Sequence, residues 1–339
     1  MGLHLKPGIS DDIDFAIWEI YGDRLGGGEL TQLAKLFKAE GLPQHLTDIL
    51  SPTLAPPHPH YREELEIKLA WIDKRPLAKL KTETSRVELG DAAIFFFDIF
   101  KVGQKYLYNR EARALVLQAK VAKEKRQIAQ PVVPVNPSVP PASSSTAREL
   151  ALLSNWAQFD LYATSGSTEP IVCDISVAPA KRPPPNGWYM ATPKIQPGAP
   201  DAAAWTSPWM CAPSASGSPC TVTFGSLLWH FLTTSAFANP TVPLPEAGVN
   251  FKFDPQYLAS PRGNGWDRLC IEILRLCPKN NLPQSLFGGP ARSAVITSVV
   301  RSLPYLGGDN WLGDLFRWLR DLIAPHGMPV LLITVLRIE

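Results

Sequence analysis

The chain has 339 residues, of which 45% are hydrophobic and 19% are charged. These proportions are typical of a folded protein with a substantial core, and they exclude a largely disordered chain. The formal net charge is +2, so affinity for nucleic acid requires a local basic patch. The 34 prolines are about twice the usual share of ~5% and predict many stiff loops.

The first residues do not form the apolar stretch of a secretory signal, because Lys6, Asp11 and Asp12 interrupt it. Apolar runs elsewhere fall short of the ~18 residues that a membrane-spanning helix needs. The cysteines contain no Cys-x-x-Cys pair, so we expect reduced thiols in a cytoplasmic protein. These residues are Cys173, Cys211, Cys220, Cys270 and Cys277.

Helices are expected in the first part of the chain, over residues 13–21 and 29–40, with the glycines 26–28 between them. The glycines lack the lysine-serine/threonine ending of a P-loop and follow no predicted strand, so we expect a helix-breaking turn. A further helix is predicted over residues 61–72. It would end before Pro76, because proline disfavours helix in the residue before it.

Two buried strands follow, over residues 87–99 and 113–121, since each contains an apolar run. The first carries Glu88-Leu-Gly-Asp91 and the second carries Gln118-Ala-Lys120. A carboxylate and an amide oxygen can hold a divalent metal, and a lysine beside them offsets charge on a phosphate. This combination on neighbouring strands points to the hydrolysis of phosphodiester bonds.

Basic residues concentrate between positions 101 and 127, where only Glu111 and Glu124 oppose them. Positive charge at this place would lie along a phosphate backbone. A solvated hairpin tip without a ligand is the alternative. The basic residues are Lys101, Lys105, Arg110, Arg113, Lys120, Lys123, Lys125 and Arg126, and all except Lys120 are assigned to nucleic-acid binding.

The proline-rich and serine-rich stretch 130–145 has the composition of a linker, and we interpret it as a loop inserted within one core. Thr146-x-x-Glu149 then predicts a capping box before a short helix that ends near Trp156. A strand is expected over residues 159–163.

Short strands and helices alternate in the second half of the chain. Seven of the ten tryptophans lie beyond residue 187, and we expect them to pack in the core rather than form a partner surface. Strands are predicted over residues 171–177, 188–192 and 330–338, and helices over 224–234, 266–276 and 311–323.

The segment from residue 61 to residue 163 resembles the PD-(D/E)xK restriction-endonuclease-like superfamily. Glu88-Leu-Gly-Asp91 is similar to its acidic element, and Gln118-Ala-Lys120 to its third motif. Glutamine in place of the usual glutamate makes the chain most similar to the Mrr-type branch. That branch carries a glutamate on the helix before the first strand, and Glu66 stands at this position, 25 residues ahead of Asp91.

The resemblance implies a site for Mg²⁺ or Mn²⁺. Asp91 would be the principal ligand, joined by the amide oxygen of Gln118 and the backbone carbonyl of Ala119. Glu88 has an odd offset from Asp91 and so faces the other side of a regular strand, although a bend at Gly90 would bring it back.

Two further roles follow from the same resemblance. Lys120 would position the attacking water or stabilise the charged phosphate. Glu66 would act as an outer ligand or as a base that orients the water. The alternative for Asp91 and Lys120 is a partly buried salt bridge between neighbouring strands, and a catalytically inactive copy of the fold stays open.

The expected fold class is α/β, with a restriction-endonuclease-like αβββαβ core over residues 61–165. A helical segment, 1–60, would precede it and a mixed α+β region, 166–339, would follow as a regulatory or docking part. The expected function is cleavage of DNA with low sequence specificity, as in effector nucleases of antiphage systems that work with a partner such as an Argonaute protein. A non-catalytic interaction protein and an RNase are the alternatives, and a homo-oligomer stays open.

Overall fold

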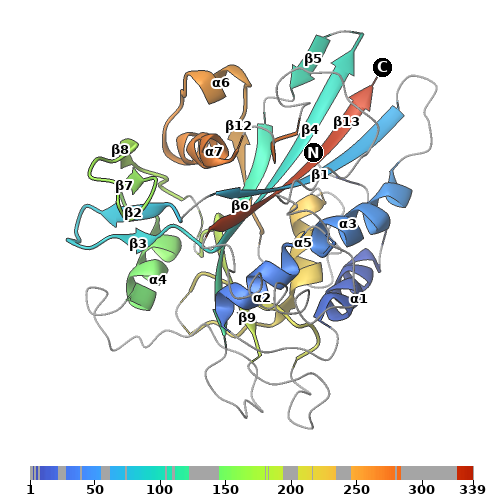
Figure 1. Ribbon diagram of the computed structural model, residues 1–339, viewed down its shortest axis with the longest axis horizontal. Coiled ribbons are helices and arrows are strands. Elements are labelled where there is room, and N and C mark those ends of the chain that lie inside the picture. The colour runs from blue at the N-terminus through green and yellow to red at the C-terminus, as the bar shows by residue number, and fades with distance from the viewer. Residues whose placement is uncertain are drawn as a thin grey trace, which may run out of the picture.

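The protein is a mixed α/β structure in which helices cover a large mixed β-sheet, and a smaller sheet lies at its side (Figure 1). The computed structural model describes residues 3, 5–6, 8–21, 28–38, 40–54, 62–72, 75–103, 105–108, 111–121, 145–179, 181, 183–193, 205–215, 217–233, 246–278, 281–283 and 327–338. The predicted loop 130–145, apart from Ser145, and the predicted helix 311–323 lie outside these residues.

The central sheet has the strand order β1-β13-β4-β6-β9-β10-β11. The pairs β13–β4 and β6–β9 are parallel and the other neighbours are antiparallel. β12 pairs with the first half of β6, and β5 forms a hairpin with the end of β4. The bounds are β1 Arg62–Ile72, β13 Met328–Ile338, β4 Ala92–Val102, β6 Glu111–Val121, β9 Gly187–Thr192, β10 Met210–Pro213, β11 Val222–Thr223, β12 Val249–Lys252 and β5 Lys105–Tyr108.

The predicted strands at 113–121, 188–192 and 330–338 are confirmed as β6, β9 and β13. Their apolar runs are buried on both faces, because helices cover both sides of the sheet. The expected strand 87–99 is divided by a bend at residues 89–91. Only β4 enters the central sheet, while β3 (Val87–Glu88) belongs to the smaller one.

The predicted helix over residues 61–72 is wrong, because this segment is strand β1. Glutamate, leucine, lysine and alanine favour a helix, but apolar and charged residues alternate here with a period of two. Leu65 and Ile67 accordingly pack on one face of the sheet, and Ala70 and Ile72 on the other. Eleven residue pairs with β13 fix this register.

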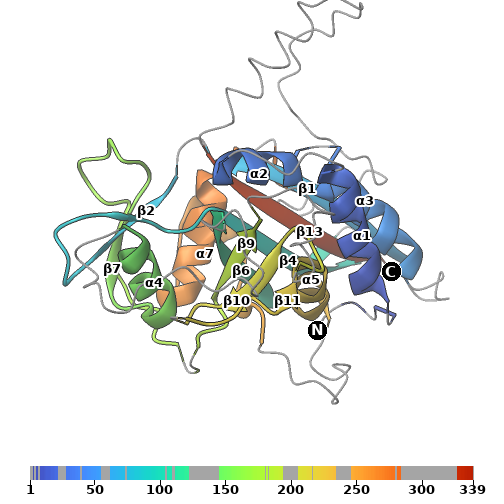
Figure 2. The ribbon, with the colours of Figure 1, turned by 90° about the horizontal axis from the view of Figure 1, so that it is seen from below.

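Helices form separate layers on the two faces of the central sheet (Figure 2). Four helices line the first face and share its core, and α7 and α4 contribute to the core on the second face. The first layer contains α1 (Ile9–Tyr21), α2 (Glu29–Leu36), α3 (Leu42–Leu50) and α5 (Phe224–Leu232). The second contains α4 (Ser145–Asn155) and α7 (Gly265–Leu276), and the short α6 (Gln256–Ala259) precedes α7.

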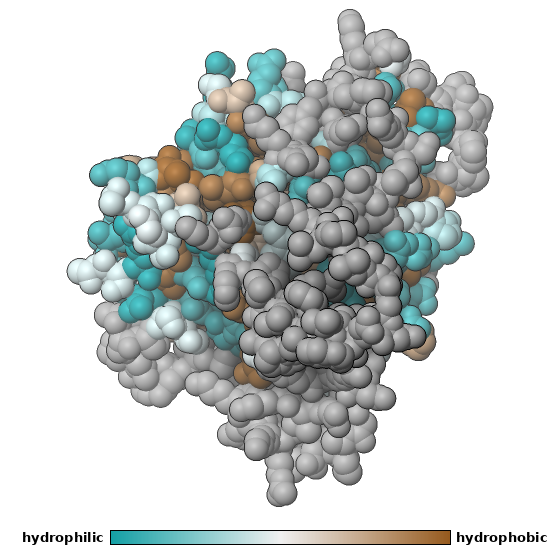
Figure 3. Space-filling model, viewed as in Figure 1, coloured by the Kyte–Doolittle hydropathy of each residue, from teal (hydrophilic) through white to brown (hydrophobic). Residues whose placement is uncertain are grey.

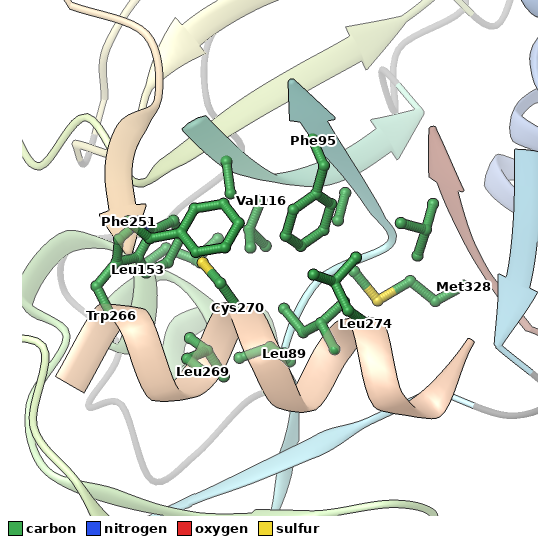
Figure 4. Close-up of a cluster of buried hydrophobic side chains, with 14 of the residues drawn as sticks. Leu89, Phe95, Val116, Leu153, Phe251, Trp266, Leu269, Cys270, Leu274 and Met328 are labelled. Carbon is green, nitrogen blue, oxygen red and sulfur yellow. The ribbon is translucent and has the colours of Figure 1, made fainter. Parts of the chain in front are cut away.

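Aromatic and aliphatic side chains together fill the core between α7 and the central sheet (Figure 4). Phe95 and Phe251 meet edge to face, with ring centroids 5.7 Å apart. Trp266 meets Trp156 in the same way at 5.4 Å. Trp156, Trp188 and Trp209 are fully buried, as expected for core tryptophans.

The smaller sheet has the order β3-β2-β7-β8 and lies beside α4 (Figure 1). The described surface over it is mostly hydrophilic or neutral (Figure 3). β7 and β8 confirm the strands expected near residues 159–163 and 171–177. The remaining bounds are β2 Leu77–Leu80, β7 Phe159–Tyr162 and β8 Val172–Ile175.

The chain beyond residue 165 shares the central sheet with the segment before it. β9, β10, β11 and β12 extend the sheet from β6, and β13 lies between β1 and β4. The sheet therefore crosses the expected boundary at residue 165. The helices predicted at 224–234 and 266–276 are present as α5 and α7.

All five cysteines have free thiols, and four of them are buried. Among the residues that the structure describes, no helix combines the length and the apolar character needed to cross a membrane.

Candidate active site

Asp91, Gln118 and Lys120 converge at one end of the pair β4–β6. Asp91 immediately precedes β4, and its backbone N–H donates to the carbonyl of Leu117 at 2.8 Å. Gln118 and Lys120 are two residues apart on β6 and so share a face. Val116 lies on the same face of β6 and belongs to the core under α7, so Gln118 and Lys120 point to the α7 side of the sheet. The structure therefore brings the side-chain amide of Gln118 onto Asp91 and places Lys120 on the same face of β6.

The Asp91 carboxylate is held on both oxygens. Oδ2 accepts a hydrogen bond from the backbone N–H of Ala119 at 2.9 Å and another from the side-chain amide of Gln118. Oδ1 lies 3.2 Å from Nη1 of Arg75, which also contacts Glu88. Ala119 thus contacts Asp91 through its N–H group.

Gly90 allows the bend that brings Asp91 to β6. A Cβ atom on Gly90 would lie 2.5 Å from Cγ1 of Val116 and 3.1 Å from the carbonyl oxygen of Leu117. A larger residue would push the bend away from the strand. Glu88 stays on β3, and it is linked to Asp91 through Arg75.

Two helices contribute acids that the sequence analysis did not assign to the site. Nζ of Lys120 lies 2.9 Å from Oε2 of Glu149 on α4 and 3.7 Å from Oε2 of Glu29 on α2. Glu29 is the first residue of α2, where the helix N-terminus favours negative charge. Glu149, predicted to cap its own helix, pairs with Lys120 instead, and Thr146 lies inside α4.

Glu66 lies far from these residues. On β1 it pairs with Thr334, which pairs with Phe97 of β4. Phe97 is six residues along the strand from Asp91, a distance of roughly 20 Å at about 3.3 Å per residue. Glu66 contacts Lys68 at 3.2 Å. Glu29, at the start of α2, is the helical glutamate that lies beside Lys120.

Burial and neighbouring charges control protonation in the site. Burial raises the pKa of Asp91 well above its ordinary value, and the nearby charge of Glu29 adds to this rise. Burial also raises the pKa of the Glu29 carboxyl. Burial acts to lower the pKa of Lys120, but the carboxylates of Asp91, Glu29 and Glu149 outweigh it and the pKa rises. Lys120 is therefore a stable ammonium group.

Two buried oxygens beside Asp91 have no hydrogen bond to any part of the chain that the structure describes: Oε1 of Gln118 and Oη of Tyr189. Tyr189 on β9 is paired in register with Gln118. Buried polar atoms nearly always have a partner, so these two oxygens are the places where a bound water molecule or a ligand would be expected.

Oxygen donors of this kind suit a hard divalent cation such as Mg²⁺ or Mn²⁺. Among the described residues, no three histidine, cysteine, aspartate or glutamate side chains are grouped to hold a metal. A metal at Asp91 would therefore depend on the amide oxygen of Gln118 as well as on carboxylates.

Comparisons of the chain with protein-family models, curated proteins and solved structures give no match. The case for a function therefore depends on the contacts, burial and charge around Asp91.

The expected basic patch is only partly described. The Arg113 guanidinium donates to the carbonyls of Phe231 and Thr233, at 2.8 and 3.1 Å, and to Asn250 at 3.2 Å. These bonds tie β6 to α5 and β12, so the guanidinium is already engaged within the fold. Lys101 lies on β4 and Lys105 on β5. Arg110, Lys123, Lys125 and Arg126 lie outside the described residues.

Proposed function

We propose that the protein is a nuclease that hydrolyses phosphodiester bonds with Mg²⁺ or Mn²⁺. The observation that carries the proposal is the convergence of Asp91, Gln118 and Lys120 on one face of β4 and β6, with Glu29 beside them. A site of this composition is similar to that of the PD-(D/E)xK superfamily. Glu29 takes the role that the sequence analysis assigned to Glu66.

The residues present fit a divalent cation. Four carboxyl groups face two side-chain cations, so full ionisation leaves an excess of two negative charges. Asp91 Oδ1, Gln118 Oε1 and the Glu29 carboxylate would hold the metal, and Glu88 and the carbonyl of Ala119 stay as outer candidates. When bound, a divalent cation would polarise the phosphate and lower the pKa of a water molecule. The carboxyl groups are those of Glu29, Glu88, Asp91 and Glu149, and the cations are those of Arg75 and Lys120.

Lys120 and Glu29 contribute different chemistry. The ammonium of Lys120 is fixed by Glu149 at 2.9 Å and would stabilise negative charge that develops on the phosphate oxygens. The Glu29 carboxylate, 3.7 Å from Lys120, would serve as a ligand or would orient the attacking water, the two roles expected of Glu66.

The proposed substrate is DNA, cut with low sequence specificity, because the chain carries no zinc-finger spacing or other DNA-reading motif. By its resemblance to effector nucleases of antiphage systems, the protein would act in the cytoplasm and would be controlled by a partner such as an Argonaute protein. RNA has the same scissile group and is the second substrate to test.

One observation favours a different function, that of a non-catalytic interaction protein. Both oxygens of Asp91 already contact groups of the chain, namely Gln118, Ala119 and Arg75. A closed network of buried charge can serve conformational specificity alone.

Nicking of supercoiled plasmid with Mg²⁺ or Mn²⁺, alongside a labelled RNA of mixed sequence, tests the proposal. We expect cleavage by the wild type and a loss of about 100-fold or more in Asp91→Asn and in Lys120→Ala. Cleavage that persists in both variants would show that another site is responsible. No cleavage of either substrate with either metal would favour the interaction protein.

A further inference from the structure

Arg75 enters the site from the smaller sheet. β2 and β3 pair Leu77 with Glu88, and the N–H of Leu89 donates to the carbonyl of Pro76 at 3.0 Å. This pairing places the residue before Pro76 beside the bend that leads to Asp91. The Arg75 side chain is 14% exposed, so its charge is held largely away from water.

One nitrogen of Arg75 connects two acids. Nη1 contacts Oε2 of Glu88 and lies 3.2 Å from Oδ1 of Asp91. The other Asp91 oxygen, Oδ2, is taken by Gln118 and Ala119. The guanidinium therefore stands at the one oxygen of Asp91 that is left for a metal ion.

We infer that the Arg75 guanidinium occupies, in the metal-free protein, the position at Asp91 Oδ1 that a divalent metal would take. Metal binding displaces the guanidinium from Asp91 toward Glu88. The inference rests on the proposed function, because it takes Asp91 as a metal ligand. It makes Arg75 a positioning residue that sets the affinity for metal.

Charge balance is the physical reason. With neither a metal ion nor Arg75, an ionised Asp91 would be a buried carboxylate beside Glu29 without a cation on Oδ1, and an unpaired buried charge is strongly unfavourable. The arginine relieves this cost. A guanidinium and a divalent cation repel each other strongly at the distance of a shared oxygen, so they cannot both occupy Oδ1.

Glu88 can remain the ion-pair partner of Arg75 after the arginine leaves Asp91. It lies on β3, separate from the strands that carry Asp91 and Gln118, and its side chain is 35% exposed. The Arg75–Glu88 contact can therefore persist while the contact with Asp91 opens. Removing Glu88 would leave Arg75 with Asp91 as its main partner and would make displacement harder.

Calorimetric titration of the purified full chain with Mn²⁺ measures this competition directly. We expect Arg75→Met to bind Mn²⁺ about tenfold more tightly than the wild type, a coupling of ordinary size between two sites. Glu88→Gln should bind more weakly than the wild type. Unchanged or weaker binding by Arg75→Met would overturn the inference.

Arg337→Met is the matched control. Arg337 also bridges two acids, with Nη1 3.3 Å from Asp98 Oδ2 and Nε 3.0 Å from Glu63 Oε1, and Asp98 lies in the second half of β4. This substitution should leave the Mn²⁺ affinity unchanged. A tenfold gain in this variant as well would mean that a general loss of positive charge is responsible, and the inference would fail.

Asp91→Asn separates the inference from the proposed function. If this variant binds Mn²⁺ as the wild type does, the metal lies elsewhere and both fail. If it loses binding while wild type and Arg75→Met bind equally, the nuclease proposal stands and the role of Arg75 falls. No binding by any variant contradicts both.

Arg75→Lys covers the case in which the methionine variant does not fold. A lysine keeps the charge but is a single point charge that cannot bridge two carboxylates as a guanidinium does. We expect its Mn²⁺ affinity to rise above that of the wild type, by less than tenfold. An affinity equal to or below that of the wild type would contradict the inference.

Discussion

Similar groups of buried charge with different neighbours lie at the start of strand β4 and in its second half. In each group an arginine bridges a buried aspartate and a glutamate, and burial raises the pKa of each aspartate. The Asp91 cluster consists of Asp91, Arg75 and Glu88, and the Asp98 cluster consists of Asp98, Arg337 and Glu63.

The difference lies in what surrounds each aspartate. Asp91 meets the amide of Gln118 and lies in the field of Lys120 and Glu29. Asp98 points to the opposite face of the sheet, because its neighbours Phe97 and Ile99 belong to the core under α7. An arginine between two acids therefore does not by itself identify an active site, because the same arrangement occurs as a structural ion pair in the Asp98 cluster. The added amide and amine distinguish the candidate active site.

Removal of the arginine from the Asp98 cluster should have the largest effect on stability. Arg337→Met leaves the Asp98 carboxylate buried without its cation, and we expect the free energy of unfolding to fall by about 3–5 kcal/mol. Urea denaturation followed by circular dichroism measures the change. A loss below about 1 kcal/mol would show that Asp98 is relieved by other groups, and would weaken the comparison.

Cleavage assays should show whether Glu29 or Glu66 acts as the glutamate of the site. Glu29→Gln should lower plasmid nicking by about 100-fold, close to 2.7 kcal/mol in the barrier, because it removes an ionisable group beside Lys120. Glu66→Gln, whose parent residue contacts Lys68, should cleave within about twofold of the wild type. The reverse result would restore Glu66 to the site.

The bend beside Asp91 gives a smaller effect. Gly90→Ala forces Val116 or the backbone of Leu117 to move, and we expect a loss of about 1–3 kcal/mol in the free energy of unfolding. Gly166→Ala is the control, since its nearest neighbour would be Thr164 Oγ1 at 3.8 Å, and should change stability by less than about 0.5 kcal/mol. Equal effects would show that the bend tolerates a side chain.

The smallest effect concerns pH. Burial raises the pKa of Asp98 above its ordinary value of 3.8, while the charge of Arg337 acts to lower it. The folded protein therefore holds this proton to higher pH than the unfolded chain. This contribution to stability is fully present below pH 3.8 and is lost as the pH rises through the folded pKa.

Asp98→Asn has no such proton, so its stability relative to the wild type should improve as the pH rises above about 4. Denaturation curves for both proteins between pH 4 and pH 7 measure the difference. A deficit of the variant that grows with pH would mean that the pKa of Asp98 is lowered in the folded state.

The sequence predicted the strands of the site because their apolar runs are long and are bounded by charged residues. It also predicted that Asp91 and Gln118 lie on neighbouring strands, since strands close in sequence usually pair, and β4 and β6 are antiparallel neighbours with β5 between them in the chain. Glu29 was within reach, as the first residue of a predicted helix. It was missed because the segment containing Glu66 was interpreted as the helix before the first strand.

Other features depend on contacts between distant parts of the chain. Arg75 and Glu149 reach the site through the smaller sheet and α4, whose positions the local sequence pattern does not specify. The place of β13 in the sheet is likewise set by pairing with β1 and β4. A buried apolar strand shows that it has neighbours, but not which ones.

The position of β13 has a consequence for synthesis on the ribosome. β1 and β4 are its two neighbours, yet more than two hundred residues separate the end of β4 from Met328. At about 5–20 residues per second, the growing chain would wait roughly 10–45 seconds with both strand edges open. Open edges invite pairing with other chains. Chaperones that shield nascent polypeptides would thus matter most for this protein before β13 completes the central sheet.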